Sequence, residues 1–184
     1  MDYVNTWYGD ISQPLFDRFS DIKLVVFDVD GVFSDGRIYL GNHGEELKAF
    51  HTRDGFGVKA LADAGFSLAV ITGRQSQIVE QRMQHLSVEH IFQGVNNKQK
   101  VFVELLEQLQ LTFQQVAYVG DDIPDLALIE QVGVGIAVQD AHPLVQQRAD
   151  YVTRCLGGHG AVREVSDLLL MAHGKLHDVS GASI

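Results

Sequence analysis

Two aspartates one residue apart, Asp28 and Asp30, are the residues whose types and spacing point most plainly to chemistry. They follow the largely apolar run Ile22–Phe27, which is typical of a buried parallel strand. Open α/β sheets bind ligands at the carboxyl ends of their strands, so both carboxylates are expected to face one crevice, from which Gly31 lets the chain turn away. Close carboxylates repel each other and need a cation or a shared proton. The pair therefore predicts a hard-metal site in which a nucleophile lies beside a general acid.

Three further motifs follow other predicted strands. Thr72-Gly73-Arg74 ends one strand, Lys98 begins a helix after an Asn-rich turn, and Gly120-Asp121-Asp122-Ile123-Pro124-Asp125 ends a third strand. Each motif alone is a weak signal, because a strand-ending Asp is common and most Lys side chains are simply solvated. Lys100 is a nearby competitor for the role of Lys98. In this order, and each at a strand end, the motifs jointly predict a single site.

The elements that must position these residues alternate between strand-like and helix-like segments. Such alternation predicts an α/β fold, a doubly wound parallel sheet with helices on both faces. The predicted strands are Leu24–Asp28, Phe66–Thr72, Val88–Phe92, Val116–Gly120, Gly133–Val138 and Tyr151–Val152. The predicted helices are Gly57–Ala64, Ser76–Leu86, Lys98–Leu109, Pro124–Gln131, Pro143–Ala149 and Val162–His173. Asp54 is expected to cap the first of these helices.

One segment interrupts this alternation. Arg37–Leu40 and Leu47–Phe50 flank the turn Gly41–Gly44, so residues 37–50 are expected to form a small inserted β-hairpin. A lone hairpin is marginally stable in water, so we expect another subunit to contact it. We expect residues 1–184 to form one domain, with its core over about residues 22–173 and a mobile polar tail over about residues 174–184.

Composition excludes several classes of function. A net charge of −10 disfavours nucleic acid and anionic membrane surfaces as partners, and it allows an anionic substrate only where basic residues gather locally. No apolar run approaches the 18 residues of a membrane span, and Met1–Asn5 lacks the pattern of a signal peptide. The single cysteine, Cys155, excludes an internal disulfide and fits a reducing, cytoplasmic location.

The order Asp-x-Asp-Gly, Thr-Gly-Arg, Lys and Gly-Asp-Asp-x-x-Asp resembles the haloacid dehalogenase superfamily of phosphohydrolases, over roughly Leu24 to Val138. A closer resemblance is to the family of 3-deoxy-D-manno-octulosonate 8-phosphate (KDO 8-phosphate) phosphatases. Four stretches carry it: Phe27–Val32, the hairpin running into His51–Gly55, the Thr72-Gly73-Arg74 turn, and Gly157–Glu164. The resemblance implies a Rossmann-like core of the haloacid dehalogenase type. Only about 20 residues follow Gly31 where a cap domain would be inserted, so we expect a capless enzyme.

The resemblance also implies roles for the site residues. Asp28 would attack phosphorus to form an aspartyl phosphate, and Asp30 would act as general acid and then as general base. Asp28, the backbone carbonyl of Asp30, and Asp121 resemble the family's Mg²⁺ ligands, with Mn²⁺ or Co²⁺ able to substitute. Thr72 and Lys98 would bind phosphate oxygens, and Lys98 would also restrain Asp28.

A sugar acid phosphate is the substrate class that the resemblance implies. The substrate-binding residues carried over are Asp30, His51, Thr52, Arg53, Asp54, Gly55, Lys59, Arg74, Arg82, Lys98 and Asp122. Solvated or salt-bridged roles remain open for Arg53, Lys59 and Arg82. Asp122 is expected to hold a neighbouring group or water and Asp125 to support the turn, with helix capping open for both.

The resembled family also implies a homotetramer in which hairpins associate and C-terminal segments reach neighbouring sites. Here Gly158–Arg163 would be such a segment, although His159 stands where the family often has Arg. Three other functions are weighed. A phosphatase for nine-carbon sugar acid 9-phosphates, of the sialic-acid type, is the main alternative. A phosphoacceptor signalling domain would place its acidic pair before the phosphorylated Asp, whereas here Asp28 precedes the Asp121-Asp122 pair. A non-catalytic homologue would not need every motif residue, and all of them are present here.

Overall fold

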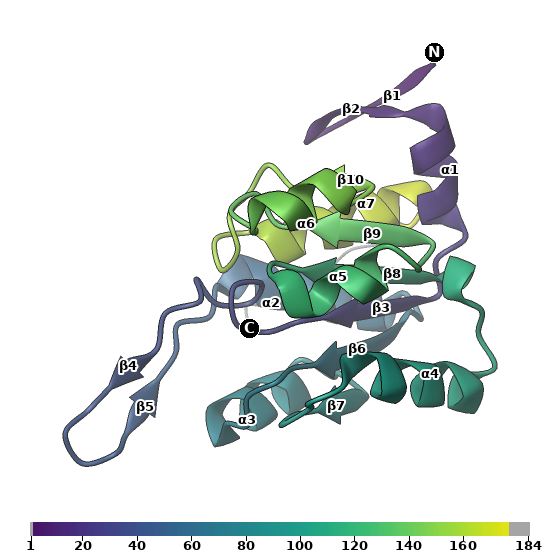
Figure 1. The fold of residues 1–184 in the computed structure, drawn as a ribbon. Coiled ribbons are helices and arrows are strands. Elements are labelled where there is room, and N and C mark those ends of the chain that lie inside the picture. The colour runs from purple at the N-terminus through teal and green to yellow at the C-terminus, as the bar shows by residue number, and fades with distance from the viewer. Residues whose placement is uncertain (1, 177–184) are drawn as a thin grey trace.

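A six-stranded parallel sheet forms the centre of the protein, with the strand order β10-β9-β8-β3-β6-β7 (Figure 1). The computed structural model describes residues 2–176. The strands are β3 (Leu24–Phe27), β6 (Ser67–Ile71), β7 (His90–Phe92), β8 (Val116–Gly120), β9 (Val134–Ala137) and β10 (Tyr151–Val152). All residues of β3, β8 and β9 are buried, as apolar runs covered on both faces should be. The predicted doubly wound α/β fold is confirmed.

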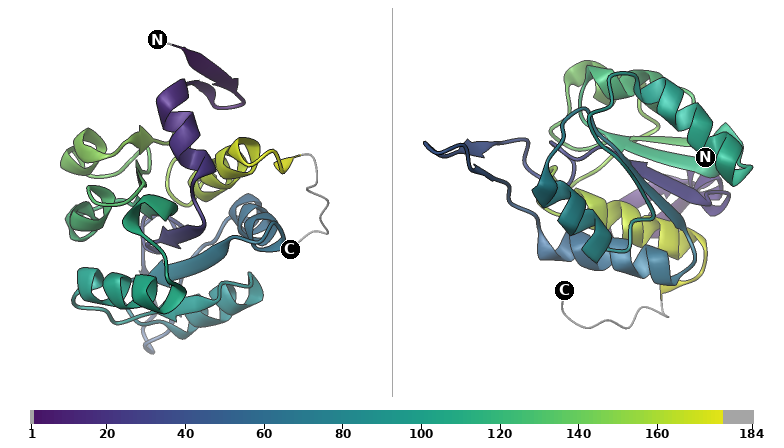
Figure 2. Two further views of the ribbon diagram at one scale, coloured as in Figure 1. Left: turned by 90° about the vertical axis from the view of Figure 1, so that its right-hand side faces the viewer. Right: turned by 90° about the horizontal axis from the view of Figure 1, so that it is seen from below.

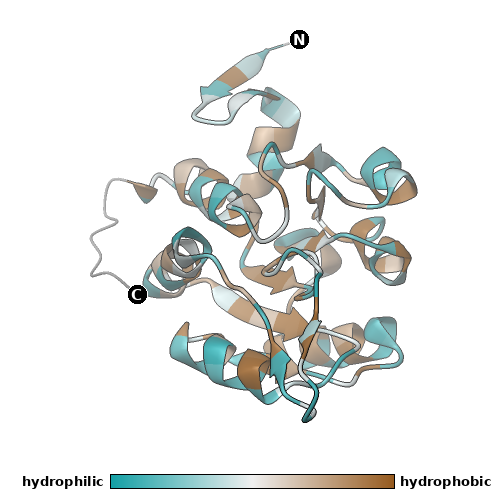
Figure 3. Ribbon diagram, turned by 90° about the vertical axis from the view of Figure 1, so that its left-hand side faces the viewer, coloured by the Kyte–Doolittle hydropathy of each residue, from teal (hydrophilic) through white to brown (hydrophobic). Residues whose placement is uncertain are grey.

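Helices cover both faces of this sheet (Figure 2). One face carries α1 (Gln13–Ser20), α2 (Thr52–Asp63), α3 (Gln77–His85) and α7 (Ala161–Ala172). The other face carries α4 (Lys98–Leu109), α5 (Leu126–Ile129) and α6 (Pro143–Arg148), with the short 3₁₀ turns η1 (Phe113–Gln115) and η2 (Ile123–Asp125) between elements. Apolar residues gather on the strands, and the helices have polar residues on their outer sides (Figure 3). Among residues 2–176, no helix is both long and apolar enough to cross a membrane.

The strand order reverses between β3 and β8, and this reversal positions the site. The chain runs from β3 outward through β6 to β7, crosses back through α4, and continues outward on the other side from β8. At such a switch point the loops that leave two neighbouring strands diverge and open a crevice at the carboxyl edge. The Asp28-x-Asp30 loop leaves β3 there, and the Asp121–Asp125 loop leaves β8.

The predicted hairpin is confirmed, with strands β4 (Tyr39–Leu40) and β5 (Glu46–Leu47) paired antiparallel. It projects from the body of the molecule at the carboxyl end of the sheet (Figure 1). It adds only two-residue strands at this point of the chain, so the expected capless architecture is also confirmed.

A second hairpin, β1 (Tyr3–Thr6) with β2 (Gly9–Ser12), and the helix α1 that follows it were not predicted. Its signal in the sequence is weak, because the strands are short and carry few apolar residues. The hairpin is anchored by a distant partner, since the Tyr8 hydroxyl donates to Asp167 of α7 at 2.7 Å. At the other end of the chain, the start of the expected tail is held by backbone bonds from Gly174 and Lys175 to α7, and residues 177–184 lie outside the described residues.

The prediction that Asp54 caps its own helix was wrong. α2 begins five residues earlier than expected, and His51 is its N-cap, accepting the Arg53 N–H. Asp54 is 1% exposed and accepts the N–H groups of Gly160 and Arg163 at 3.3 and 2.8 Å. It therefore caps α7, a helix distant in sequence, and links it to α2.

Candidate active site

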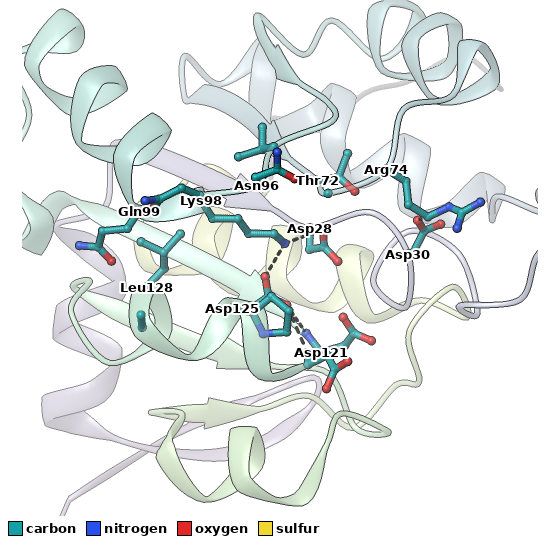
Figure 4. A pocket seen from close by; sticks show the side chains of 16 residues that line it. Asp28, Asp30, Thr72, Arg74, Asn96, Lys98, Gln99, Asp121, Asp125 and Leu128 are labelled. Atoms are coloured by element: carbon teal, nitrogen blue, oxygen red, sulfur yellow. Dashed lines mark hydrogen bonds and ion pairs between the residues drawn. The ribbon is translucent and has the colours of Figure 1, made fainter.

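A cavity of about 680 Å³ lies at the carboxyl edge of the sheet, over the switch point (Figure 4). It unites the four predicted motifs from the ends of β3, β6 and β8 and the start of α4. The residues that line it are Asp28, Asp30, Thr72, Gly73, Arg74, Val95, Asn96, Asn97, Lys98, Gln99, Asp121, Asp122, Pro124, Asp125, Ala127 and Leu128. Of these, Val95, Gln99, Ala127 and Leu128 were not singled out from the sequence.

Asp28 lies at the floor of this cavity, directly after β3. Its backbone N–H continues the sheet by donating to Val119 at 2.9 Å, which fixes where its side chain begins. The Asp28 side chain is 11% exposed, and one of its oxygens accepts from Lys98 Nζ at 2.9 Å. Burial and the charge of Asp125 raise the pKa of Asp28 to about 6, although Lys98 opposes the rise. Above that pH, the buried Asp28 side chain is ionised.

Lys98, the first residue of α4, bridges Asp28 and Asp125 (Figure 4). Its Nζ lies 2.7 Å from Asp125 Oδ1, and its side chain is 10% exposed. Burial lowers the pKa of Lys98, but the two carboxylates outweigh this effect and the net pKa is raised. Lys100, the competitor, is 72% exposed and pairs with Glu104 at 3.9 Å, so Lys98 is the lysine that reaches the cavity.

Asp125 supports the loop after β8 with both of its oxygens. Oδ1 accepts from Lys98 and from the Tyr118 hydroxyl, and Oδ2 accepts the N–H groups of Asp121 and Asp122 at 3.1 and 3.3 Å. Its acceptor positions are therefore already in use. The sequence predicted that Asp125 supports the turn, but it did not predict the hydrogen bond from the Tyr118 hydroxyl of β8.

Asp28, Asp121 and Asp125 each offer a carboxylate oxygen within 4.8 Å of the others. Hard oxygen donors of this kind fit Mg²⁺. Burial and the neighbouring carboxylates of Asp28, Asp125 and Asp122 raise the pKa of Asp121 to about 8. Such a raised pKa is expected where carboxylates are gathered to bind a cation and the cation is absent. Asp125 has the fewest free acceptor positions, so Asp28 and Asp121 are the side chains best placed as ligands. The predicted contribution of the Asp30 carbonyl stays a prediction.

Gly31 allows the loop after β3 to approach Asp121. Its φ is +93°, a left-handed conformation that residues with a Cβ rarely adopt, and a Cβ there would collide with the Asp121 carboxylate. The loops that leave β3 and β8 therefore meet only because this residue is glycine.

Asp30 turns away from the three clustered carboxylates, toward Arg74 at the rim (Figure 4). Its Oδ1 pairs with Lys48 Nζ, and its Oδ2 lies 3.8 Å from Arg74 Nε. Lys48 comes from the end of the β4–β5 hairpin and was missed from the sequence, where a lysine beside a two-residue strand looks solvated. Thr72, 3% exposed, lies beyond β6 with its backbone N–H bonded to Phe92, and Asp122 is exposed and caps η2.

A model of haloacid dehalogenase-like hydrolases matches residues 87–164. The 3-deoxy-D-manno-octulosonate 8-phosphate phosphatase KdsC of Escherichia coli is 51% identical over 179 residues, which cover 97% of this chain and 95% of that protein. The chain belongs to the haloacid dehalogenase-like hydrolases. The predicted membership is thereby confirmed, and with it the expectation of an enzyme.

Solved structures of other members of this hydrolase family agree with the fold. The phosphatase of the same name from Yersinia pestis has a TM-score of 0.97 at 48% identity, covering 100% of this chain and 99% of that one. The one from Moraxella catarrhalis, in complex with magnesium, phosphate and KDO, has a TM-score of 0.88 at 40% identity, covering 90% and 95%. A cobalt-bound form from Haemophilus influenzae has a TM-score of 0.84 at 40% identity, covering 89% and 96%.

Several predicted substrate residues of this hydrolase lie outside the cavity lining. His51, Thr52, Arg53, Asp54 and Gly55 form the N-cap and first turn of α2, and Lys59 Nζ donates to Ser87 at 2.8 Å. The guanidinium of Arg82 packs close to Gly55, and burial lowers its pKa. Its buried Nε has no hydrogen-bond partner among the described residues. Within one chain, the structure brings together Asp30, Arg74, Lys98 and Asp122 from the predicted set, and it leaves Arg82 and the residues of the α2 end outside the cavity lining.

The Gly157–Glu164 segment packs against the hydrolase's own loop after β3. The Gly158 N–H donates to Val32 at 2.8 Å, and the Gly157 N–H donates to Asp140 Oδ1 at 2.8 Å. A Cβ on Gly157 would collide with the Gly31 carbonyl, and one on Gly158 with the backbone at Ser34 and Asp35. The two glycines thus support the loop that carries Asp30, across more than 120 residues of sequence.

Replacing Asp125 with Asn tests its supporting role. The amide would set an NH₂ group against two backbone donors or against Lys98 and Tyr118, so we expect the free energy of unfolding to fall by about 2–4 kcal/mol. Urea titration followed by circular dichroism measures this. Asp122→Asn is the matched control, because Asp122 is exposed and is expected to lose less than about 1 kcal/mol. Equal losses in the two variants would contradict the role given to Asp125.

Proposed function

We propose that the protein hydrolyses KDO 8-phosphate to KDO and inorganic phosphate through an aspartyl phosphate on Asp28. The observation that carries this proposal is the environment of Asp28, a buried carboxylate at the end of β3 with Lys98 at 2.9 Å. The identity of 51% to a phosphatase named for this substrate supports the choice of sugar acid.

In the first step, an oxygen of Asp28 attacks phosphorus and the bond from phosphorus to the sugar oxygen breaks. A carboxylate suits this role because the acyl phosphate that it forms is itself readily hydrolysed. Lys98 holds the other side of Asp28 and brings a positive charge beside the transferred group. Thr72, which lines the cavity at the neighbouring strand end, would donate its hydroxyl to a phosphate oxygen.

Asp30 would handle the protons of both steps. It gives a proton to the departing sugar alkoxide, which leaves as KDO. The resulting carboxylate then takes a proton from a water molecule, which attacks the aspartyl phosphate and releases phosphate and free Asp28. The position of its side chain at the rim, beyond the carboxylate cluster, fits contact with the leaving group, whereas only its backbone carbonyl is proposed to reach the metal.

Asp28 and Asp121, with the Asp30 carbonyl, would hold Mg²⁺, for which Mn²⁺ or Co²⁺ can substitute. The chemistry supplied by the bound ion is neutralisation of the carboxylates that face a phosphate dianion, and stabilisation of charge during transfer. The magnesium and cobalt in two related structures support this assignment.

The sugar acid needs cations beyond the phosphate site. Two cationic side chains lie at the rim of the cavity. Arg74 is half exposed and can therefore reach the carboxylate of a bound sugar acid, whereas the Lys48 side chain is fully buried. His51–Gly55, Lys59 and Arg82 remain proposed substrate residues, and they lie away from this chain's own cavity. A cytoplasmic location, consistent with one free cysteine, also remains part of the proposal.

Phosphate release from sugar acid phosphates tests the function. We expect magnesium-dependent turnover of KDO 8-phosphate at a higher kcat/KM than that of nine-carbon sugar acid 9-phosphates. A preference for the nine-carbon substrates would favour the sialic-acid-type alternative. No turnover of any sugar acid phosphate would contradict the enzyme proposal and leave the signalling or non-catalytic alternatives.

We further propose that the β4–β5 hairpin mediates assembly into a homotetramer. Tyr39, Leu40 and Leu47 are 50%, 73% and 63% exposed on it, an apolar surface that association would remove from water. In sedimentation velocity, we expect the wild type to be a tetramer and Leu40→Asp to shift toward smaller species. Leu144→Asp, in the first turn of α6, is the control and should leave the sedimentation coefficient unchanged. A monomeric wild type at all concentrations would contradict the proposal.

A further inference from the structure

Four charged side chains of alternating sign form a closed ring at the rim of the cavity. Lys48 Nζ pairs with Asp30 Oδ1 and lies 3.7 Å from Glu46 Oε1. The Arg74 guanidinium lies 3.5 Å from Glu46 Oε2 and 3.8 Å from Asp30 Oδ2. The ring joins three segments that are separate in sequence: the loop after β3, the second strand of the hairpin, and the loop after β6.

The burial of Lys48 is the unusual feature of this ring. Its side chain is 0% exposed, although its neighbour Leu47 is 63% exposed on a projecting hairpin. A buried ammonium group loses several kcal/mol of hydration, and pairing with carboxylates often does no more than offset that loss. An apolar residue at position 48 would stabilise the fold about as well. The charge is therefore better explained by what it does to Asp30.

Each carboxylate oxygen of Asp30 has its own cation. Lys48 engages Oδ1 from the hairpin, and Arg74 approaches Oδ2 from the opposite side. Arg74 is 51% exposed, so it can leave Asp30 for a substrate, whereas the buried amine of Lys48 cannot. Once a sugar acid carboxylate takes Arg74, Lys48 is the contact left to hold the Asp30 side chain at the rim.

We propose that Lys48 is a positioning residue that orients the Asp30 carboxyl group toward the leaving-group oxygen, so that the hairpin takes part in catalysis through Asp30. This inference rests on the proposed function of Asp30 and extends it to a residue outside the cavity lining. Lys48 itself touches neither the substrate nor the phosphate.

The chemistry of the leaving group provides a readout that a merely structural role would not move. A sugar alkoxide is a poor leaving group and needs the proton that Asp30 delivers, whereas p-nitrophenolate leaves without one. Misplacing Asp30 should therefore slow phosphoryl transfer from a sugar phosphate by roughly the 10²-fold or more that general acid catalysis contributes. It should leave transfer from p-nitrophenyl phosphate nearly unchanged.

The experiment compares Lys48→Met with Lys100→Met, a control on the exposed face of α4. We expect Lys48→Met to lower kcat for the sugar acid phosphate about 10²-fold with KM changed less than about threefold, and the control to match the wild type. In stopped flow, the first release of p-nitrophenolate should stay within about threefold of the wild type in both variants. If Lys48→Met melts below the assay temperature, Lys48→Gln is measured instead. We expect the same result, a loss of kcat on the sugar acid phosphate and almost none on p-nitrophenyl phosphate.

Equal losses on both substrates would overturn the proposal, because they would indicate general damage to the site. No loss on either substrate would overturn it as well. Failure of the proposed function is a separate outcome, recognised in the wild type alone: absence of turnover of every sugar acid phosphate. If the wild type turns over its substrate but Lys48→Met affects the sugar acid phosphate and p-nitrophenyl phosphate equally, the proposed function stands. The positioning role of Lys48 is then excluded.

Discussion

Asp28→Asn should abolish phosphate release while the protein stays folded. The amide has the same shape as the carboxylate but cannot attack phosphorus, so we expect kcat to fall by at least about 10³-fold. Malachite green detection of phosphate measures the loss, and circular dichroism confirms the fold. Trapping of ³²P on the wild type but not on the variant would locate the covalent intermediate. Residual activity near that of the wild type would refute Asp28 as the nucleophile.

The same variant has a predicted effect on stability in the absence of metal. The pKa of Asp28 is raised from 3.8 to about 6, so the folded state disfavours the ionised form. This unfavourable contribution is absent below about pH 3.8, grows as pH rises to about 6, and is then fully present. In EDTA at pH 7.5, Asp28→Asn should therefore melt at a higher temperature than the wild type. If Asp28→Asn melted at a lower temperature than the wild type, the ionised Asp28 carboxylate would be shown to stabilise the metal-free fold.

Removal of divalent cations should abolish activity and lower the melting temperature. Three carboxylate oxygens lie within 4.8 Å of one another, and Lys98 offsets only part of their mutual repulsion, so a bound divalent cation should stabilise the folded state. A ligand at 100 times its Kd stabilises the folded state by about 2.7 kcal/mol, which for a chain of this size raises the melting temperature by about 5–11 °C. Thermal scans in EDTA and after addition of Mg²⁺, Mn²⁺ or Co²⁺ measure this. No shift with any of the three ions would contradict a metal site.

The stabilisation by Mg²⁺ should also depend on pH. Without a cation the pKa of Asp121 is about 8, so the folded protein binds a proton there over the range in which an unfolded Asp121 is ionised. The metal-free fold therefore loses stability as pH rises from about 4 to 8, and below pH 8 Mg²⁺ must displace that proton. The shift should be larger at pH 8.5 than at pH 6. Asp121→Asn is the control in which this difference should disappear.

Much of the sheet and the centre of the site could be predicted, for a shared physical reason. Strands buried on both faces, such as β3 and β8, must be almost wholly apolar, and their ends are marked by the first polar residue. Asp28, Thr72 and Asp121 each follow such a strand directly. Because parallel strands end at one edge, their proximity follows from the topology alone.

The contributions of Lys48 and Asp54 could not be predicted, because they depend on contacts between segments distant in sequence. The Lys48 side chain is buried only because the chain that returns from the projecting hairpin passes beside Asp30, and no local pattern of hydrophobicity encodes that path. Asp54 has the type and position of a helix cap, yet it caps α7 rather than α2. The N-terminal hairpin was missed for a similar reason, since Tyr8 is anchored by Asp167.

The support of the Asp30 loop by Gly157 and Gly158 has a consequence for how the enzyme is made. The ribosome has synthesised every residue that lines the cavity by Leu128. The loop after β3 is still unsupported at that stage, because the two glycines that pack against Gly31 and Val32 have not yet been translated. One of the first segments of the site to be synthesised is thus the last to be fixed. We expect nascent chains to acquire catalytic competence only near the end of translation.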